Sequence, residues 1–226
     1  MIALLALMAF AACGQNLITN PGFESGATGY TTDYTVDTTP TGQGQAGVRG
    51  SGTSGTGSSS VFNSGSTSLT AHGGSKFFAV NGSTSGTAIV WEQTVSSLVI
   101  SGLTGSTFTF SFWIAAGDAA STTPSGQRPT IAVIINGTSI GNVTPSTTDG
   151  AWTQFTGTWT RGTNTTADIK LIDLKTASTG NDFILDDFVL VPEPSTYAAG
   201  VFLVGAGYFA WRKARRKSAA QEIAVR

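Results

Sequence analysis

The chain has 226 residues and a formal net charge of −1, and 11% of its residues are charged, against 29 glycines and 59 serines or threonines. Glycine, serine and threonine are neutral to poor helix formers, whereas threonine and aromatic residues favour strands. This composition argues against a helical protein and predicts one all-β domain of extracellular type. The length argues against two large domains.

The charges are unevenly distributed along the chain. Residues 15–191 hold 11 acidic and 6 basic residues, whereas residues 212–226 hold 6 basic residues and 1 acidic residue. Basic residues gathered in a tail argue against a nucleic-acid-binding face on the domain, so we expect no nucleic-acid partner. The single cysteine, Cys13, allows neither an internal disulfide nor a cysteine-based metal site.

An apolar run opens the sequence. Residues 1–12 read MIALLALMAFAA, which has the length of the apolar region of an export signal and is too short to span a bilayer as a helix. Residues 9–11, Ala-Phe-Ala, resemble a cleavage site with small residues at both ends. We therefore predict a signal peptide over residues 1–14. Lipidation of Cys13, as in bacterial lipoproteins, is an alternative that the sequence leaves open.

Alternating polarity is the main signal within the domain. In residues 107–114 every second position is apolar, which buries one face of a strand, while Trp113 falls on the opposite, polar face. Asn-Gly pairs at residues 81–82 and 136–137 tolerate positive φ and predict tight turns. Residues 38–60 are rich in glycine, serine and threonine and are expected to form a loop without a strand. Further strands are expected over residues 76–80, 130–135, 152–159, 168–174 and 183–191. An antiparallel β-sandwich or barrel fits this pattern best.

Residues 192–217 combine three features in a fixed order. A Pro-Glu-Pro tripeptide follows the last predicted strand, and an apolar stretch covers residues 197–211. As a helix this stretch is about 22 Å long, and long basic side chains can close the gap to a hydrocarbon core of about 30 Å. A basic cluster at residues 212–217 keeps its own side in the cytoplasm, which places the domain outside. The residues of the three-part signal that we single out are Pro192, Glu193, Pro194, Arg212, Lys213, Arg215, Arg216 and Lys217.

This order of tripeptide, short apolar helix and basic cluster resembles the PEP-CTERM sorting signal of Gram-negative bacteria. The resemblance implies recognition of residues 192–217 by an exosortase, an integral membrane cysteine transpeptidase. It also implies that the inner membrane holds the precursor until it is cut near the motif, with release or attachment at the cell surface. Such proteins are associated with bacteria that produce exopolysaccharide, biofilms or flocs. Residues 218–226 form a tail beyond the signal.

Two segments of the domain carry a second resemblance. Residues 16–26, NLITNPGFESG, and residues 181–190, NDFILDDFVL, look like the opening and closing strands of galactose-binding-like jelly rolls, the fold of many carbohydrate-binding modules. The resemblance implies that residues 15–191 form a jelly-roll β-sandwich. It also implies that the first and last strands lie close together.

The closing strand carries adjacent carboxylates at Asp186 and Asp187. By the period of two, Asp186 shares a face with Phe188 and Leu190, so it is directed among apolar side chains, where an ionised carboxylate needs a partner. Two acidic side chains with backbone carbonyls suit Ca²⁺. The resembling modules hold a structural Ca²⁺ at such a position, which implies Glu24, Asp186 and Asp187 as ligands here. In the alternative interpretation Glu24 caps backbone amides and Asp187 is a solvated charge.

Aromatic rings on polar strand faces are candidates for sugar binding, because a flat ring packs on the apolar face of a pyranose while amides and hydroxyls bind its hydroxyl groups. Trp113 lies on such a face, and Trp152 shares one with Gln154. Tyr30 and Tyr34 are expected to contribute from a loop. In the alternative interpretation these aromatic residues cover sheet edges or plug the ends of the sandwich.

No nucleotide-binding motif or histidine spacing for a metal indicates a cofactor. Glu24, Glu92 and Asp118 are carboxylates that a hydrolase would need in pairs, but nothing in the sequence pairs them. His72, the single histidine, lies beside two glycines and is expected to be an exposed turn residue. We therefore expect a non-enzymatic exported protein with a structural or adhesive role at the cell surface or in the extracellular matrix. A carbohydrate-binding module for exopolysaccharide is the alternative, and a hydrolase is a weaker one.

Overall fold

The computed structural model describes residues 15–40, 42–51, 69–96, 98, 107–117, 126–148, 150–178 and 180–193. The predicted signal peptide, Pro194, the helix and basic cluster of the sorting signal, and the tail lie outside these residues. The described residues contain no helix with the length and hydropathy that a membrane span needs.

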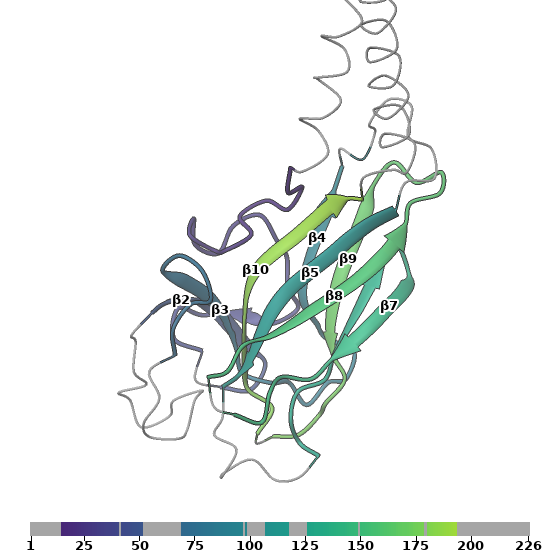
Figure 1. Cartoon of the computed structure of the whole chain (residues 1–226). Helices are drawn as coiled ribbons and strands as arrows, with labels where there is room; N and C mark the ends of the chain where they lie inside the picture. Colours follow the sequence, from purple (N-terminus) through teal and green to yellow (C-terminus); the bar gives the residue numbers. More distant parts are fainter. Residues whose placement is uncertain are drawn as a thin grey trace, which may run out of the picture.

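The described strands form two sheets that pack face to face (Figure 1). The six-stranded sheet has the order β1 (Thr35–Val36), β2 (Gln45–Gly50), β3 (Lys76–Val80), β10 (Phe183–Pro192), β5 (Thr107–Ala116), β8 (Thr153–Thr160). The four-stranded sheet has the order β4 (Ile89–Val95), β9 (Ala167–Asp173), β6 (Ile131–Ile135), β7 (Thr138–Val143). Strands β3 to β10 are distributed between the sheets in the winding order of a jelly roll, which confirms the expected β-sandwich.

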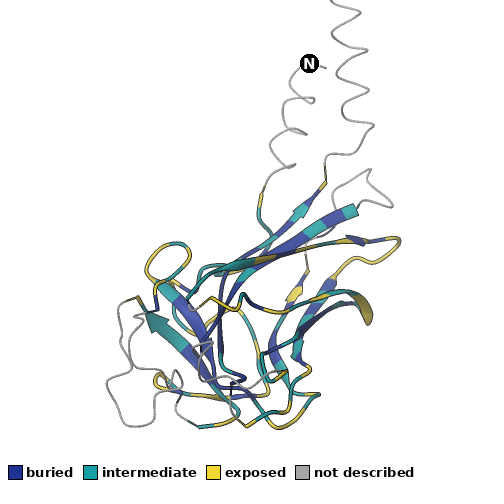
Figure 2. Ribbon diagram, turned by 60° about the horizontal axis from the view of Figure 1, so that its bottom comes forward, coloured by how far each residue is buried: buried dark blue, intermediate teal, exposed yellow. Residues whose placement is uncertain are grey.

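The core lies between the two sheets, and buried residues follow the strands that face it (Figure 2). The alternation predicted for β5 is confirmed, because Phe108, Phe110, Phe112 and Ile114 are at most 1% exposed and belong to this core. The Phe188 ring lies among other aromatic rings, with centroid distances of 4.5 Å to Trp91 and 5.3 Å to Phe112. Burial of such rings is the main contribution to the stability of a sandwich of this kind.

The opening segment of the domain joins the closing strand, as the resemblance implied. The Leu17 amide donates to the Leu190 carbonyl at 3.0 Å. The Asn16 side chain donates to the Phe188 carbonyl at 2.8 Å and accepts from the Leu190 amide at 2.9 Å. Residues Phe183 to Leu185 of β10 pair with β3. Farther along the same edge of β10, the opening segment takes the place of β3.

The prediction that residues 38–60 form a loop without a strand is wrong for residues 45–50, which form β2. Residues 41 and 52–60 lie outside the described residues. Residues Ala46 to Gly50 of β2 pair with β3. Ala46 is fully buried in the core. At Gly47 a Cβ atom would lie 1.7 Å from the Asp37 carbonyl oxygen, so only glycine allows this close approach. At Gly47 the glycine therefore marks a strand with a close backbone approach.

A bulge in β10 overturns the predicted direction of Asp186. The register against β5 shifts between Asp186 and Val189, and Asp187 has a φ of 50°. The extra residue shifts the alternation by one position, so residues before and after the bulge that strict alternation would place on one face lie on opposite faces. Phe188 and Leu190 therefore face the core, whereas Asp186 lies opposite Trp113 on the outer face of the six-stranded sheet. The side chain is nonetheless completely buried.

A second, smaller apolar cluster explains that burial. It lies on the outer face of the six-stranded sheet, where residues before β3 pack over the strands, and Ala71 and Trp152 are partly buried against it. Its buried members are Leu69, Phe77, Ala79, Ala115 and Ile184. The cluster holds the segment before β3 against the sheet and so places residues 72–76 beside β10 and β5.

The closing strand reaches slightly beyond the predicted domain end at residue 191. Pro192 is the last residue of β10 and pairs with Phe108. The Glu193 amide still donates to the Thr107 carbonyl at 2.9 Å, and its carboxylate accepts from the Thr109 hydroxyl at 2.9 Å. The first two residues of the Pro-Glu-Pro motif are thus part of the folded domain.

A second buried carboxylate lies at the end of β9. Asp173 is completely buried, and its oxygens accept hydrogen bonds from the Asn181 side chain at 2.7 Å and the Lys175 amide at 3.0 Å. Burial raises the pKa of Asp173 to about 6, although these hydrogen bonds oppose the shift.

We expect the free energy of unfolding to fall as pH rises from about 4 to about 6, because the native state holds the Asp173 proton more tightly than the unfolded state. A pKa raised by about two units corresponds to about 3 kcal/mol. Urea unfolding of Asp173→Asn across this range is expected to show a shallower pH dependence than the wild type. Asp168→Asn is the control, since the Asp168 side chain is partly exposed. Equal slopes for Asp173→Asn and the wild type would contradict the assignment.

Candidate functional site

The segment 72–76 is held against the sheet by carboxylates. Asp186 Oδ2 accepts hydrogen bonds from the amides of His72 at 2.8 Å and Gly73 at 3.1 Å. Asp186 Oδ1 accepts from the Asp187 amide at 2.8 Å. Burial raises the pKa of Asp186 to about 6, and the amide hydrogen bonds oppose this shift. Asp186 therefore meets its need for partners through backbone N–H groups.

Glu24 holds the other end of the same segment. Its Oε1 accepts from the amides of Ser75 at 2.7 Å and Lys76 at 2.8 Å, and its Oε2 accepts from the Ser75 hydroxyl at 2.7 Å. The hydrogen bond from the Ser75 amide is the largest of the effects that lower the pKa of Glu24. This arrangement is the alternative interpretation of Glu24, in which it caps backbone amides.

Two glycines let the backbone approach these carboxylates. A Cβ atom at Gly73 would lie 2.5 Å from Asp187 Oδ2, and one at Gly74 would lie 2.4 Å from Glu24 Oε1. Gly74 also has a φ of 64°, which disfavours any other residue. We call Glu24, Asp186 and the backbone of residues 72–76 the carboxylate clamp.

The atoms of the clamp fit a hydrogen-bonded arrangement better than a calcium site. Both oxygens of Glu24 and both oxygens of Asp186 accept hydrogen bonds, and Asp187 Oδ2 lies 2.7 Å from His72 Nδ1. Within the described ranges, no three His, Cys, Asp or Glu side chains are grouped to hold a metal ion. Ca²⁺ at Glu24, Asp186 and Asp187 stays a prediction from the sequence that this geometry does not favour.

We expect removal of calcium to leave the melting temperature unchanged, because the Glu24 and Asp186 carboxylates each already accept three hydrogen bonds from N–H and O–H donors. The measurement is thermal unfolding after dialysis against EDTA and again after addition of excess CaCl₂. A ligand that binds only the native state raises its stability. A melting temperature that rises with calcium would therefore contradict the metal-free clamp and support the calcium ligands predicted from the sequence.

His72 occupies the centre of an aromatic group above β5. Its ring stacks on the Trp113 ring with a centroid distance of 4.0 Å and an interplanar angle of 17°. Its edge meets Trp152 at 5.7 Å and 75°. Asp187 holds the ring from a third side. His72 is exposed and lies in a bend, as its sequence neighbours indicated. Its contacts with the two indoles and with Asp187 were not expected, because no local signal could reveal a partner 115 residues away.

Three predicted sugar-binding residues come together at this group. Trp113 pairs with Gln154 across β5 and β8, so both lie on the outer face of the six-stranded sheet. Trp152, two residues before Gln154, lies on the same side and packs on the small apolar cluster. Gln154 is exposed, whereas the two indoles are half-buried. We call His72, Trp113, Trp152 and Gln154 the aromatic patch.

The two predicted tyrosines lie elsewhere. Tyr34 is a core residue, 4% exposed, so its ring is not accessible to a sugar, and the prediction of a loop contribution is wrong for it. Tyr30 packs edge-on against Phe23 and Phe78 at 5.7 and 5.1 Å. Burial raises the pKa of Tyr30 to about 12 and raises that of Tyr34 further. These residues stabilise the sandwich where the opening segment covers it.

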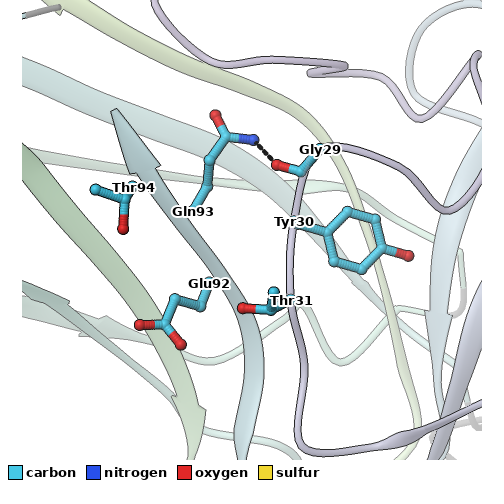
Figure 3. A pocket seen from close by; sticks show the side chains of 6 residues that line it. All are labelled: Gly29, Tyr30, Thr31, Glu92, Gln93 and Thr94. Carbon is cyan, nitrogen blue, oxygen red and sulfur yellow. Dashed lines mark hydrogen bonds between the residues drawn. The ribbon is translucent and has the colours of Figure 1, made fainter. Parts of the chain in front are cut away.

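A shallow hollow lies where residues 29–31 meet β4 (Figure 3). Gln93 points to the backbone of the opening segment, where it donates to the Gly29 carbonyl and to the Thr19 carbonyl. Glu92 pairs with Lys170 at 2.9 Å on the neighbouring strand. The side chains of the hollow are therefore engaged in holding the opening segment and the sheet. Glu24 and Glu92 have separate partners, and Asp118 lies outside the described residues.

No model of a protein family matches the chain, and no curated protein matches it. Among solved structures, the Stig cyclase Fisc from Fischerella sp. TAU, in complex with (3Z)-3-(1-methyl-2-pyrrolidinylidene)-3H-indole, is similar with 16% identity and a TM-score of 0.53, over 78% of this chain and 96% of that chain. An apo cyclase from Fischerella sp. has 19% identity and a TM-score of 0.51, over 81% of this chain and 98% of that chain.

The CBM22-1 xylan-binding domain of Paenibacillus barcinonensis Xyn10C is also similar, with 14% identity and a TM-score of 0.47, over 81% of this chain and 98% of that chain. That similarity is too distant to carry an argument. The two cyclases show that the chain shares their fold. A shared fold does not carry over an activity, because the activity depends on the residues of the site. The function therefore has to be inferred from the site of this chain.

Proposed function

We propose that the domain is a non-enzymatic adhesive module of the bacterial cell surface or extracellular matrix, which binds polysaccharide through the aromatic patch. The observation that carries the proposal is the gathering of His72, Trp113 and Trp152 beside the exposed amide of Gln154. Rings packed against one another lose little freedom when a ligand arrives, and a neighbouring amide supplies the directional hydrogen bond that orients it.

The surroundings of the patch support a sugar rather than an apolar ligand. Along β8 the outward residues Gln154, Thr156 and Thr158 are exposed, while Phe155 and Trp159 are buried in the core. The patch therefore continues into a row of hydroxyl groups. A surface with a few half-exposed rings and many hydroxyls matches the mixed apolar and polar faces of a pyranose.

We expect Trp113→Ala and Trp152→Ala each to weaken retention on a bound polysaccharide by about tenfold, which corresponds to about 1.4 kcal/mol. Affinity electrophoresis in gels that contain one polysaccharide each measures this effect. Leu174→Ala is the matched control, because Leu174 is 45% exposed and lies beyond the end of β9, in the other sheet. Absence of retention of the wild type on every polysaccharide would overturn the proposal and leave a purely structural role.

We also propose that the chain is exported and sorted by an exosortase through residues 192–217. The support in the folded domain is that β10 ends at Pro192 and that Glu193 makes the last hydrogen bonds to β5. The motif thus begins where the sandwich ends, which leaves the following residues to reach the inner membrane without unfolding the domain.

We expect alanine substitution of Arg212, Lys213, Arg215, Arg216 and Lys217 to prevent processing, because the basic cluster would no longer hold the apolar stretch at the cytoplasmic side. Immunoblots of membrane and extracellular fractions from the native host measure precursor and product. Lys170→Ala, a change in the sandwich, is the control. A product of unchanged size and location in a host without exosortase would contradict the sorting proposal.

A further inference from the structure

We infer that His72 is a ligand-contacting residue of the aromatic patch and that the patch selects an uncharged, hydroxyl-rich polysaccharide. The inference rests on the proposed sugar-binding function and gives it a chemical class. Its basis is the way the imidazole is held and the charges that lie around it.

The imidazole is fixed before any ligand arrives. Its backbone is anchored by Asp186, which accepts from the His72 amide at 2.8 Å. Its ring is held by Asp187 at 2.7 Å on one side and by the stack on Trp113 on another. A side chain that is ordered in the free protein contributes to affinity without the entropic cost of ordering it on binding.

The stack places His72 over Trp113. Because the two rings are nearly parallel at 4.0 Å, the imidazole covers part of one indole face. A sugar that approaches this part of the patch contacts the imidazole rather than the indole. The Trp113 ring then acts as a base that keeps the imidazole in place, and Trp152 forms a neighbouring wall at 5.7 Å.

The hydrogen-bond pattern leaves one ring nitrogen for the ligand. An ionised carboxylate only accepts hydrogen bonds, so Nδ1 must be the donor in the contact with Asp187 Oδ2. In the neutral ring, Nε2 is then an acceptor. Nε2 makes no hydrogen bond to the described residues, and the His72 side chain is 30% exposed. An acceptor at this place is suited to the hydroxyl group of a sugar.

The charges near the ring disfavour an anionic ligand. Asp187 contacts the imidazole, and its side chain is 36% exposed. Asp186 and Glu24 hold the same segment from below, and Lys76, the basic residue of that segment, donates its ammonium group to the Glu24 carbonyl. Like charges about 4 Å apart repel by about 1 kcal/mol even in water. A uronate or sulfate group is therefore disfavoured at this place, whereas a neutral glycan is not.

The test uses the full chain in affinity electrophoresis with hydroxyethyl cellulose and galactomannan as neutral probes and alginate as the uronate probe. We expect the wild type to be retained at least tenfold more strongly by a neutral probe than by alginate. His72→Phe keeps a flat ring over Trp113 but lacks both ring nitrogens, and we expect it to lose about tenfold of that retention. His72→Gln, with a donor and an acceptor but no ring, is expected to lose as much.

Thermal unfolding of each variant shows whether it folds, and Leu174→Ala again serves as the control. If both His72 variants bind a neutral probe as the wild type does while Trp113→Ala and Trp152→Ala lose binding, the role of His72 is overturned and the proposed function stands. Stronger retention on alginate would overturn the ligand class. If no probe retains the wild type, the proposed function and this inference fail together.

Discussion

The buried carboxylate of Asp186 is the contact on which the outer face of the six-stranded sheet depends. Its two oxygens accept hydrogen bonds from the amides of His72, Gly73 and Asp187. A buried carboxylate without such partners would cost several kcal/mol, so the segment before β3 and the bulge of β10 are stabilised together or not at all. Within the aromatic patch, this joint positions His72.

The bulge divides the functions of two adjacent aspartates. Because Asp187 has a φ of 50°, the chain inserts one residue and Phe188 returns to the core. Asp186 is then turned under residues 72–73 and holds the backbone, while Asp187 remains at the surface and holds the His72 ring. One local irregularity thus separates a structural carboxylate from one that orients a ligand-contacting side chain, which agrees with the frequent occurrence of bulges at functional sites.

Strand β10 connects this joint to the rest of the domain. It lies between β3 and β5, and the opening segment of the domain completes its edge at Leu190. The same strand ends in the first residues of the Pro-Glu-Pro motif. Core packing, the anchoring of His72 and the exit toward the proposed sorting signal therefore all involve β10. The involvement of one strand in all three is consistent with a small domain that has a single core between its two sheets.

The sequence by itself determined the strands and the faces they bury, because side-chain alternation is local. It placed Phe110 inward and Trp113 and Gln154 outward, and all three assignments hold. It could not determine the β10 bulge, since a strict period of two carries no sign of one inserted residue. Only the tertiary structure decided that Glu24 meets Ser75 and that His72 meets Asp187, 51 and 115 residues away. Such pairs are selected by the winding of the chain through the two sheets, which the residues next to them in the sequence do not reveal.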